Sequence, residues 1–356
     1  MDWKFYNTRL AAHGLANPFC KMPKEVVEHL GAIQAQDFTM AKWAIGIRTT
    51  ECTEQNIEDA FNRGEILRTH VLRPTWHFVS PENIRWMLDL TAKRIQTAAA
   101  SRDREMGITA ELFTKTNDLI AKALESNNHL TRKQLTETLQ NAGIAVDSAR
   151  MNHFLMRAET EAIICSGIIQ GKKQTYALLD ERVAAGGRLH HATPLPTREE
   201  SLAKLAKIYF TSHGPAVLHD FGWWSGLSIT DARKGLESIR NEFAEATIDG
   251  QTYFFNPTII PYNKPQVFLL PAFDEYIIAY RNRNAVITSE QNAKAISSNG
   301  IFRPTIVADG KVIGLWRKTS LKSRPLSFEY FEQPDQFTQN LVEGAAERLK
   351  KLYFCS

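Results

Sequence analysis

The chain has 356 residues, 43% of them hydrophobic and 23% charged, which indicates a folded globular protein with more than one core. No apolar run reaches the roughly 18 residues of a membrane span, and the N-terminal MDWKFYNTRL lacks the features of a signal peptide. The cysteines form no C-x-x-C pair, which favours a cytoplasmic location and argues against a zinc site. The net charge of +4 is compatible with a polyanionic partner but does not establish one.

The first segment, residues 1–115, is expected to begin with a helix over PKEVVEHLGAIQAQ, residues 23–36. A second helix is predicted over TEQNIEDAFNRG, and strand-like residues follow in ILRTHVLRPTWHFV. A long helix is predicted from Pro81, since proline is favoured in the first helical turn. These elements make up the first winged-helix-like unit.

Two further segments show three helices followed by a hairpin, which is the pattern of a winged helix. Residues 116–183 contain the capped helix LTRKQLTETL, then VDSARMNHFLMRAETEA and a hairpin that turns at Gly171. Residues 198–260 contain three helical stretches, the last capped by Thr230, and a hairpin that turns at Asp249-Gly250. The segment between them holds His190 and His191, which lack a partner at a metal-ligand spacing and are interpreted as loop residues.

The last segment, residues 265–356, alternates in the manner of strands and ends in the helix QFTQNLVEGAAERLKKLYF. VADGKVIG carries an Asp-Gly hairpin turn. The sequence therefore predicts an α+β fold of tandem winged-helix units, mostly α, with a C-terminal β-rich, barrel-like domain.

No common catalytic or nucleotide-binding motif indicates the chemistry of this chain. No Walker loop, G-x-G-x-x-G, H-E-x-x-H or G-x-S-x-G is present. Residues 63–104 contain eight arginines and lysines against four acids, and residues 311–324 contain five basic residues and no acid. Each stretch is either a solvated basic face or a surface that binds along the phosphate backbone of a nucleic acid.

Five stretches together show a family resemblance: LGAIQAQDF, LRTHVLRPTWHFVSPENIRWML, HGPAVLHDFGWWSGL, LLPAFDEYIIAYRNR and VADGKVIGLWRK. On these, the chain resembles the AlkZ/YcaQ-like winged-helix DNA glycosylases. The resemblance implies tandem winged helices curved around duplex DNA and removal of alkylated purines, above all N7-alkylguanine, with interstrand crosslinks as substrates of some members. The catalytic Gln-apolar-Gln motif of one branch matches Gln34-Ala35-Gln36.

Two amides suit a base that already carries a positive charge. An N7-alkylguanine leaves as a neutral base, so the enzyme needs to hold a water and stabilise a sugar cation rather than supply a strong acid or base. On a regular helix, however, Gln34 and Gln36 would point about 200° apart. Both can serve one site only if the helix ends or loosens near Ala35; otherwise one of them caps or packs.

Other candidate residues follow from position and residue type. Asp37 and Asp274 are candidates to line the site, although Asp274 and Glu275 can instead form a buried pair with Arg281 or Arg283. Trp76, Trp223 and Trp224 are interpreted as core residues. The candidate DNA contacts are Arg68, His70, Arg73, His77, Arg150, Arg157, Lys172, Lys173, Arg317 and Lys318.

The sequence thus predicts a monofunctional DNA glycosylase that acts on double-stranded DNA with alkylated bases. We expect no metal or organic cofactor, no membrane association, no obligate protein partner, a monomer, and a cytoplasmic, nucleoid-associated location. The alternatives are a non-catalytic winged-helix DNA-binding regulator and a protein-interaction scaffold. A regulator keeps its function when both glutamines are substituted. Strong salt dependence of duplex binding would count against the scaffold.

Overall fold

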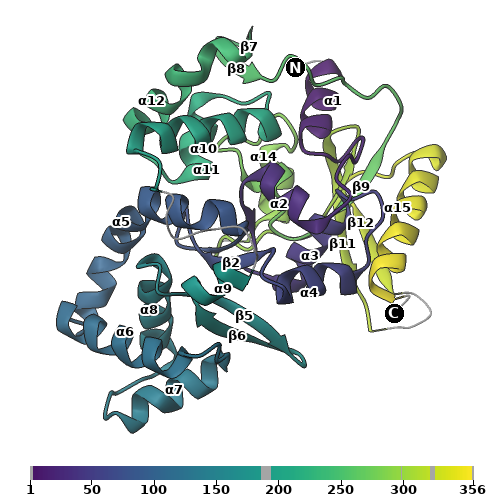
Figure 1. Ribbon diagram of the computed structural model, residues 1–356. Coiled ribbons are helices and arrows are strands. Elements are labelled where there is room, and N and C mark those ends of the chain that lie inside the picture. The colour runs from purple at the N-terminus through teal and green to yellow at the C-terminus, as the bar shows by residue number, and fades with distance from the viewer. Residues whose placement is uncertain (1–2, 186–193, 298, 321–324, 355–356) are drawn as a thin grey trace. The chain divides into compact units, whose positions relative to one another are not determined.

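The computed structural model describes residues 3–185, 194–297, 299–320 and 325–354. They fall into two compact units, one made of Met1–Ile57 with Leu202–Ser356 and the other of Glu58–Ser201. Figure 1 shows the elements of each unit. His190, His191, Lys322 and Arg324 lie outside the described residues. The fold is α+β, as expected, while the division into four segments stays a prediction.

The discontinuous unit begins with α1 (Trp3–Ala12), α2 (Pro23–Leu30), β1 (Ile33–Gln34) and α3 (Phe38–Gly46). The helix predicted over residues 23–36 is wrong in its C-terminal part, because α2 ends at Leu30. Gly31 follows with φ of +76°, and a Cβ at this position would lie 2.5 Å from the Ile208 side chain. A glycine in the left-handed region ends the helix and releases the chain into an extended segment.

Three helices and a hairpin follow in this unit: α10 (Arg198–His213), α11 (Leu218–Ser225), α12 (Ile229–Ile239), β7 (Ala244–Ile248) and β8 (Gln251–Phe255). The hairpin turn at Asp249-Gly250 is confirmed, with φ values of +50° and +73°. The predicted cap at Thr230 is wrong. Ser228 is the N-cap of α12, and its Oγ accepts from the Asp231 backbone N–H at 3.1 Å.

The C-terminal strands form one antiparallel sheet in the order β12-β11-β10-β9. Their bounds are β9 (Val267–Leu270), β10 (Thr305–Ala308), β11 (Lys311–Lys318) and β12 (Leu326–Tyr330). Between β9 and β10 lie α13 (Glu275–Ile278) and α14 (Ser289–Ala295). Within the described residues, β9 and β12 each pair on one side only, so the sheet is open and the expected barrel-like closure is not found.

The closing helix α15 (Gln336–Phe354) is confirmed and packs into the core of the same unit. Its buried residues Val342, Ala346, Leu349 and Leu352 recur at helical spacing and join the core that contains β9. The Asp309-Gly310 turn between β10 and β11 is also confirmed, with φ values of +46° and +83°.

The continuous unit contains α5 (Pro81–Glu105), α6 (Ala110–Leu124), α7 (Arg132–Asn141), α8 (Ser148–Thr160) and α9 (Leu179–Ala185). Its hairpins are β2 (Leu67–His70) with β3 (Trp76–Val79) and β5 (Ile164–Gln170) with β6 (Lys173–Leu178); β4 (Leu130–Thr131) joins β6. The predicted starts of α5 at Pro81 and of α7, capped by Thr131, are confirmed. The hairpin turn at Gly171 is confirmed as well.

Candidate active site

The Gln34-Ala35-Gln36 segment lies between α2 and α3, with Gln34 at the end of the two-residue strand β1 and Gln36 in the bend that precedes α3. Gln34 is buried, with 8% of its surface exposed, Ala35 is fully buried and Gln36 is exposed. Asp37 then acts as the N-cap of α3, where its Oδ1 accepts from the Met40 backbone N–H at 3.0 Å. The motif is therefore not helical, so the separation of about 200° expected on a helix does not apply to it, and Gln34 is buried whereas Gln36 is exposed.

A buried carboxylate holds the backbone of the motif in place. Glu275, the first residue of α13, is fully buried, and its Oε1 accepts from the Gln34 backbone N–H at 2.8 Å. Its other oxygen accepts from the Trp224 indole Nε1–H at 3.1 Å. Hydrogen bonds to an ionised acceptor are about twice as strong as neutral ones, so this contact fixes Gln34 firmly.

The neighbouring Asp274 forms a separate buried contact with Arg48, which lies just beyond the end of α3. Its carboxylate makes a two-point ion pair with Arg48, at 2.7 Å and 2.9 Å, and both side chains are buried. Arg48 also donates to the backbone oxygens of Ala44 and His13, each at 2.9 Å. The favoured pairing of this acidic pair with Arg281 or Arg283 is wrong for Asp274. Asp274 is a structural group at the start of α13.

Buried histidines surround this network without offering a proton donor at neutral pH. His213 Nε2 lies 3.9 Å from Glu275 Oε2, and the His213 ring stacks on Tyr209 with centroids 4.7 Å apart. His13 Nε2 lies 2.7 Å from the Tyr280 hydroxyl. Burial lowers the pKa of both His13 and His213. Both imidazoles are therefore neutral at pH 7 and serve as packing and hydrogen-bonding groups.

The candidates on β11 differ from each other in exposure. Arg317 is exposed, whereas Lys318 is half-buried. Burial lowers the pKa of Lys318, and the charges of Glu54 and Asp37 act in the opposite direction. Lys318 thus lies within electrostatic range of Asp37, the residue directly after the motif.

In the continuous unit, several candidate DNA contacts are tied into the fold. His70 bonds through Nδ1 to the buried Glu159, and Trp76 donates to the same carboxylate at 3.3 Å. His77 is fully buried, with Nδ1 2.9 Å from the Thr75 backbone oxygen, and burial lowers its pKa. Both histidine side chains are buried, and their roles as DNA contacts stay predictions.

The arginines of this unit are also held by protein contacts. Arg68 donates to Gln174 Oε1 at 2.7 Å and covers the Trp76 ring at 4.4 Å. Arg150 donates to the Met106 backbone oxygen at 2.7 Å, and Arg157 pairs with Glu161. Arg73 is half-buried. The contacts of Arg68, Arg150 and Arg157 hold their side chains in place, and their roles as DNA contacts stay predictions.

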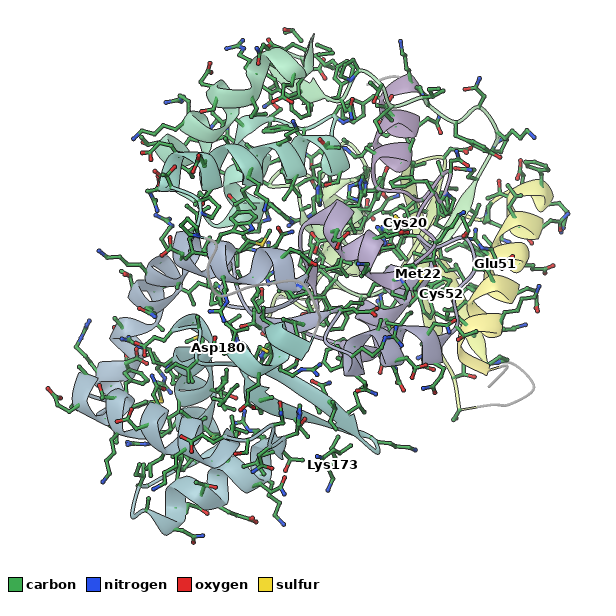
Figure 2. The ribbon with its side chains drawn as sticks, viewed as in Figure 1. Cys20, Met22, Glu51, Cys52, Lys173 and Asp180 are labelled. Atoms are coloured by element: carbon green, nitrogen blue, oxygen red, sulfur yellow. The ribbon has the colours of Figure 1, made fainter. Side chains whose placement is uncertain are left out.

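The tip of the β5–β6 hairpin carries the most accessible positive charge among the candidates of this unit. Lys172 and Lys173 are exposed, and neither has an ion pair with another described residue. Figure 2 shows the Lys173 side chain projecting from the hairpin. The two lysines lie at the tip of the hairpin that turns at Gly171, as the sequence predicts.

Comparison with known proteins decides the family. The model of a family described as DNA glycosylase AlkZ-like matches residues 27–352, which is most of the chain. This chain belongs to the AlkZ-like DNA glycosylase family. An interstrand DNA cross-link repair glycosylase of Streptomyces sahachiroi is 23% identical over 307 residues, covering 82% of this chain and 81% of that protein. The solved structure of the S. sahachiroi DNA glycosylase AlkZ superposes with a TM-score of 0.82 at 20% identity, covering 98% of this chain and 96% of the other.

Two residues of this AlkZ-like chain have positions that sequence reasoning missed. Glu275 was considered as half of an acidic pair, but its bond to Gln34 spans 241 positions and leaves no local signal. Trp223 was expected in the core with Trp224; Trp224 is fully buried, whereas Trp223 is 45% exposed. Adjacent residues of a helix point in different directions, so the helical period could have predicted that only one of these two tryptophans is buried.

Among the described residues of this AlkZ-like chain, no group of three or more histidine, cysteine, aspartate or glutamate side chains is arranged to hold a metal ion. The helices in the described part of the chain are too short or too polar to span a bilayer. The expectations of a monomer and of nucleoid association stay predictions.

Proposed function

We propose that this chain is a monofunctional DNA glycosylase that releases cationic alkylated purines of the N7-alkylguanine type from duplex DNA. The observation that supports it most is that the Gln34-Ala35-Gln36 motif lies outside the helices, with the Gln34 backbone N–H held by Glu275 at 2.8 Å and the Gln36 side chain exposed. Membership in a DNA glycosylase family supplies the reaction class.

The chemistry proposed for the two amides is positioning and electrostatics. The amide oxygens accept from an attacking water and face the positive charge that develops on the sugar ring as the glycosidic bond breaks. The base is already cationic, so it leaves as a neutral molecule with no proton donor required. Water supplies the hydroxyl that ends on C1′ of the sugar, the electron pair of the glycosidic bond leaves with the base and neutralises it, and the proton lost by the water passes to bulk solvent. An uncharged base lacks this weakness and is expected to stay attached.

A lyase step that cuts the strand is not part of the proposal. Such a step needs an amine nucleophile to form a Schiff base with the sugar. Lys42 on α3 is buried and paired with Glu54. Lys318 on β11, which lies within electrostatic range of Asp37, is half-buried. We nominate neither lysine as a Schiff-base nucleophile and propose hydrolysis alone.

Interstrand crosslinks are proposed as a second substrate class. The S. sahachiroi relative carries cross-link repair in its name, at 23% identity. A purine joined to the opposite strand cannot rotate freely out of the duplex, so a motif that acts beneath the sugar, with Gln36 exposed, suits it better than a deep base pocket.

The test is base release from a duplex with a single N7-methylguanine, at neutral pH with EDTA present. Gln34→Ala and Gln36→Ala are compared singly and together with wild type, and Gln339→Ala on α15 is the matched control. We expect release by wild type and by the control, and loss of release with duplex binding retained in the double variant. A duplex with uracil in place of the lesion checks that an uncharged base stays attached.

The regulator alternative is supported by the exposed lysines at the β5–β6 tip, which can bind phosphate without catalysis. It predicts duplex binding by all variants and release by none, including wild type. That result with methylated and crosslinked duplexes alike would refute the glycosylase proposal.

A further inference from the structure

One large aromatic side chain of the discontinuous unit is exposed on a rigid support. Trp223 on α11 has 45% of its surface exposed, although its neighbour Trp224 is fully buried. The Trp223 indole Nε1–H donates to the Ile278 backbone oxygen at 3.0 Å. The hydrogen bond of the indole N–H restricts the orientation of this partly exposed ring.

The support for this ring is the C-terminal end of α13. The last carbonyls of a helix have no partner within the helix. Here three side chains supply donors: Arg283 Nε–H to Ile277 O at 2.9 Å, Trp223 to Ile278 O, and the Tyr209 hydroxyl to Ala279 O at 3.0 Å. The Arg283 guanidinium carbon lies 5.7 Å from the centroid of the Trp223 ring. Trp223 and Arg283 are therefore oriented by the same short helix.

The other end of α13 holds the catalytic segment. Glu275 opens the helix and accepts from the Gln34 backbone N–H, and it accepts from Trp224 as well. A helix of four residues is only about 6 Å long. The exposed ring of Trp223 and the backbone of Gln34 are thus fixed to opposite ends of one rigid element.

We propose that Trp223 is a stacking contact for a nucleobase that the damaged duplex exposes. The indole face binds any base by stacking and gains a further cation–π term when the base is a cationic purine. Arg283, whose guanidinium lies over the Trp223 ring, and the exposed Arg281, in the loop after α13, provide positive charge for the phosphates on either side of that base. The inference rests on the proposed glycosylase function, because that function supplies the damaged duplex.

The direct probe is a duplex with a tetrahydrofuran abasic residue and 2-aminopurine either opposite it or next to it. Stacking of 2-aminopurine on an indole quenches its fluorescence. Wild type is compared with Trp223→Ala, Trp223→Phe and Trp223→Leu, and Phe337→Ala is the control, since Phe337 on α15 is 58% exposed. Binding is measured on the same duplexes and on an undamaged duplex.

We expect wild type to quench 2-aminopurine in at least one of the two placements. Trp223→Ala and Trp223→Leu should bind the abasic duplex about 5- to 150-fold more weakly than wild type, the range seen when a stacking aromatic is removed. Trp223→Phe should retain most of the affinity and the quenching, and Phe337→Ala should match wild type.

Two results would overturn the inference: unchanged quenching and affinity in Trp223→Ala, or full recovery in Trp223→Leu, which would show apolar packing against a protein or the sugar instead. Failure of the proposed function is recognised separately, as absence of base release by wild type from methylated and crosslinked duplexes. The 2-aminopurine measurement does not depend on turnover, so the two failures are distinguishable.

Discussion

Removal of the Glu275 carboxylate should disable the motif without touching either glutamine side chain. In Glu275→Ala, the Gln34 backbone N–H and the Trp224 indole N–H lose their acceptor, at 2.8 Å and 3.1 Å in the native protein. Each bond to a charged acceptor contributes about 1.5–3 kcal/mol, so the loss is about 3–6 kcal/mol before relaxation. The desolvation penalty of the buried carboxylate, which is also removed, offsets part of it.

Glu275→Gln is the gentler and more informative change. The amide keeps one acceptor oxygen but presents an NH2 group where the carboxylate had its second oxygen, so one of the two donors faces another donor. We expect a loss of about 1–3 kcal/mol in stability. A displacement of about 1 Å at a reacting group can reduce the rate a hundredfold, so single-turnover base release should fall by about ten- to a hundredfold.

The control is Tyr276→Phe, which removes another buried hydrogen bond from the same helix. The Tyr276 hydroxyl donates to the Gly310 backbone oxygen at 2.9 Å and does not reach the motif. Both variants are assayed well below the urea midpoint of the weaker one. Base release at the wild-type rate by folded Glu275→Gln, or an equal loss in Tyr276→Phe, would refute the assignment of Glu275 as the residue that positions Gln34.

Three further predictions follow from charges in the two units. Asp274→Asn breaks the buried pair with Arg48 and should lower the free energy of unfolding by about 3–5 kcal/mol, measured by urea denaturation; a loss under about 1 kcal/mol would contradict it. Because burial lowers the pKa of His213, the unfolded chain binds protons first; stability should be constant above about pH 6.5 and fall by at most about 1.4 kcal/mol per pH unit for this group as pH decreases toward 5, and His213→Gln should flatten that dependence. Lys172→Gln with Lys173→Gln should reduce the slope of log affinity for duplex DNA against log salt by about 0.9 per lysine that contacts phosphate, and an unchanged slope would remove this tip from the DNA surface.

The features that the sequence predicted well depend on neighbours within a few residues. The proline that starts α5, the Thr131 cap of α7 and the Asp-Gly turns each act through local backbone geometry. The helix over residues 23–36 failed because Ala32, Ile33 and Ala35 extend an apolar pattern that either helix or strand satisfies. The contact of Gly31 with Ile208, far along the chain, helps to settle that choice.

The assignment of Gln34 and Gln36 as site residues stays a prediction that came from the family resemblance, and nothing in their spacing on a helix would have brought them to one site. The open C-terminal sheet and the Glu275 contact both depend on pairings between distant residues, which leave no periodic signal in one sequence. The long-range contact with Glu275 fixes the backbone of the Gln34-Ala35-Gln36 motif.

The proposed catalytic groups are neutral amides, and their positions are fixed by buried charged groups around them. Amides contribute to catalysis only through the positions of their dipoles, so an error in position is not compensated by a favourable pKa. Two ionisable groups near the motif are buried and paired: Glu275 with Gln34 and Trp224, and Asp274 with Arg48. Because a buried charge that loses its partner is strongly unfavourable, this arrangement resists displacement. In the proposed reaction these two side chains act through geometry, and the proton that is released comes from the attacking water.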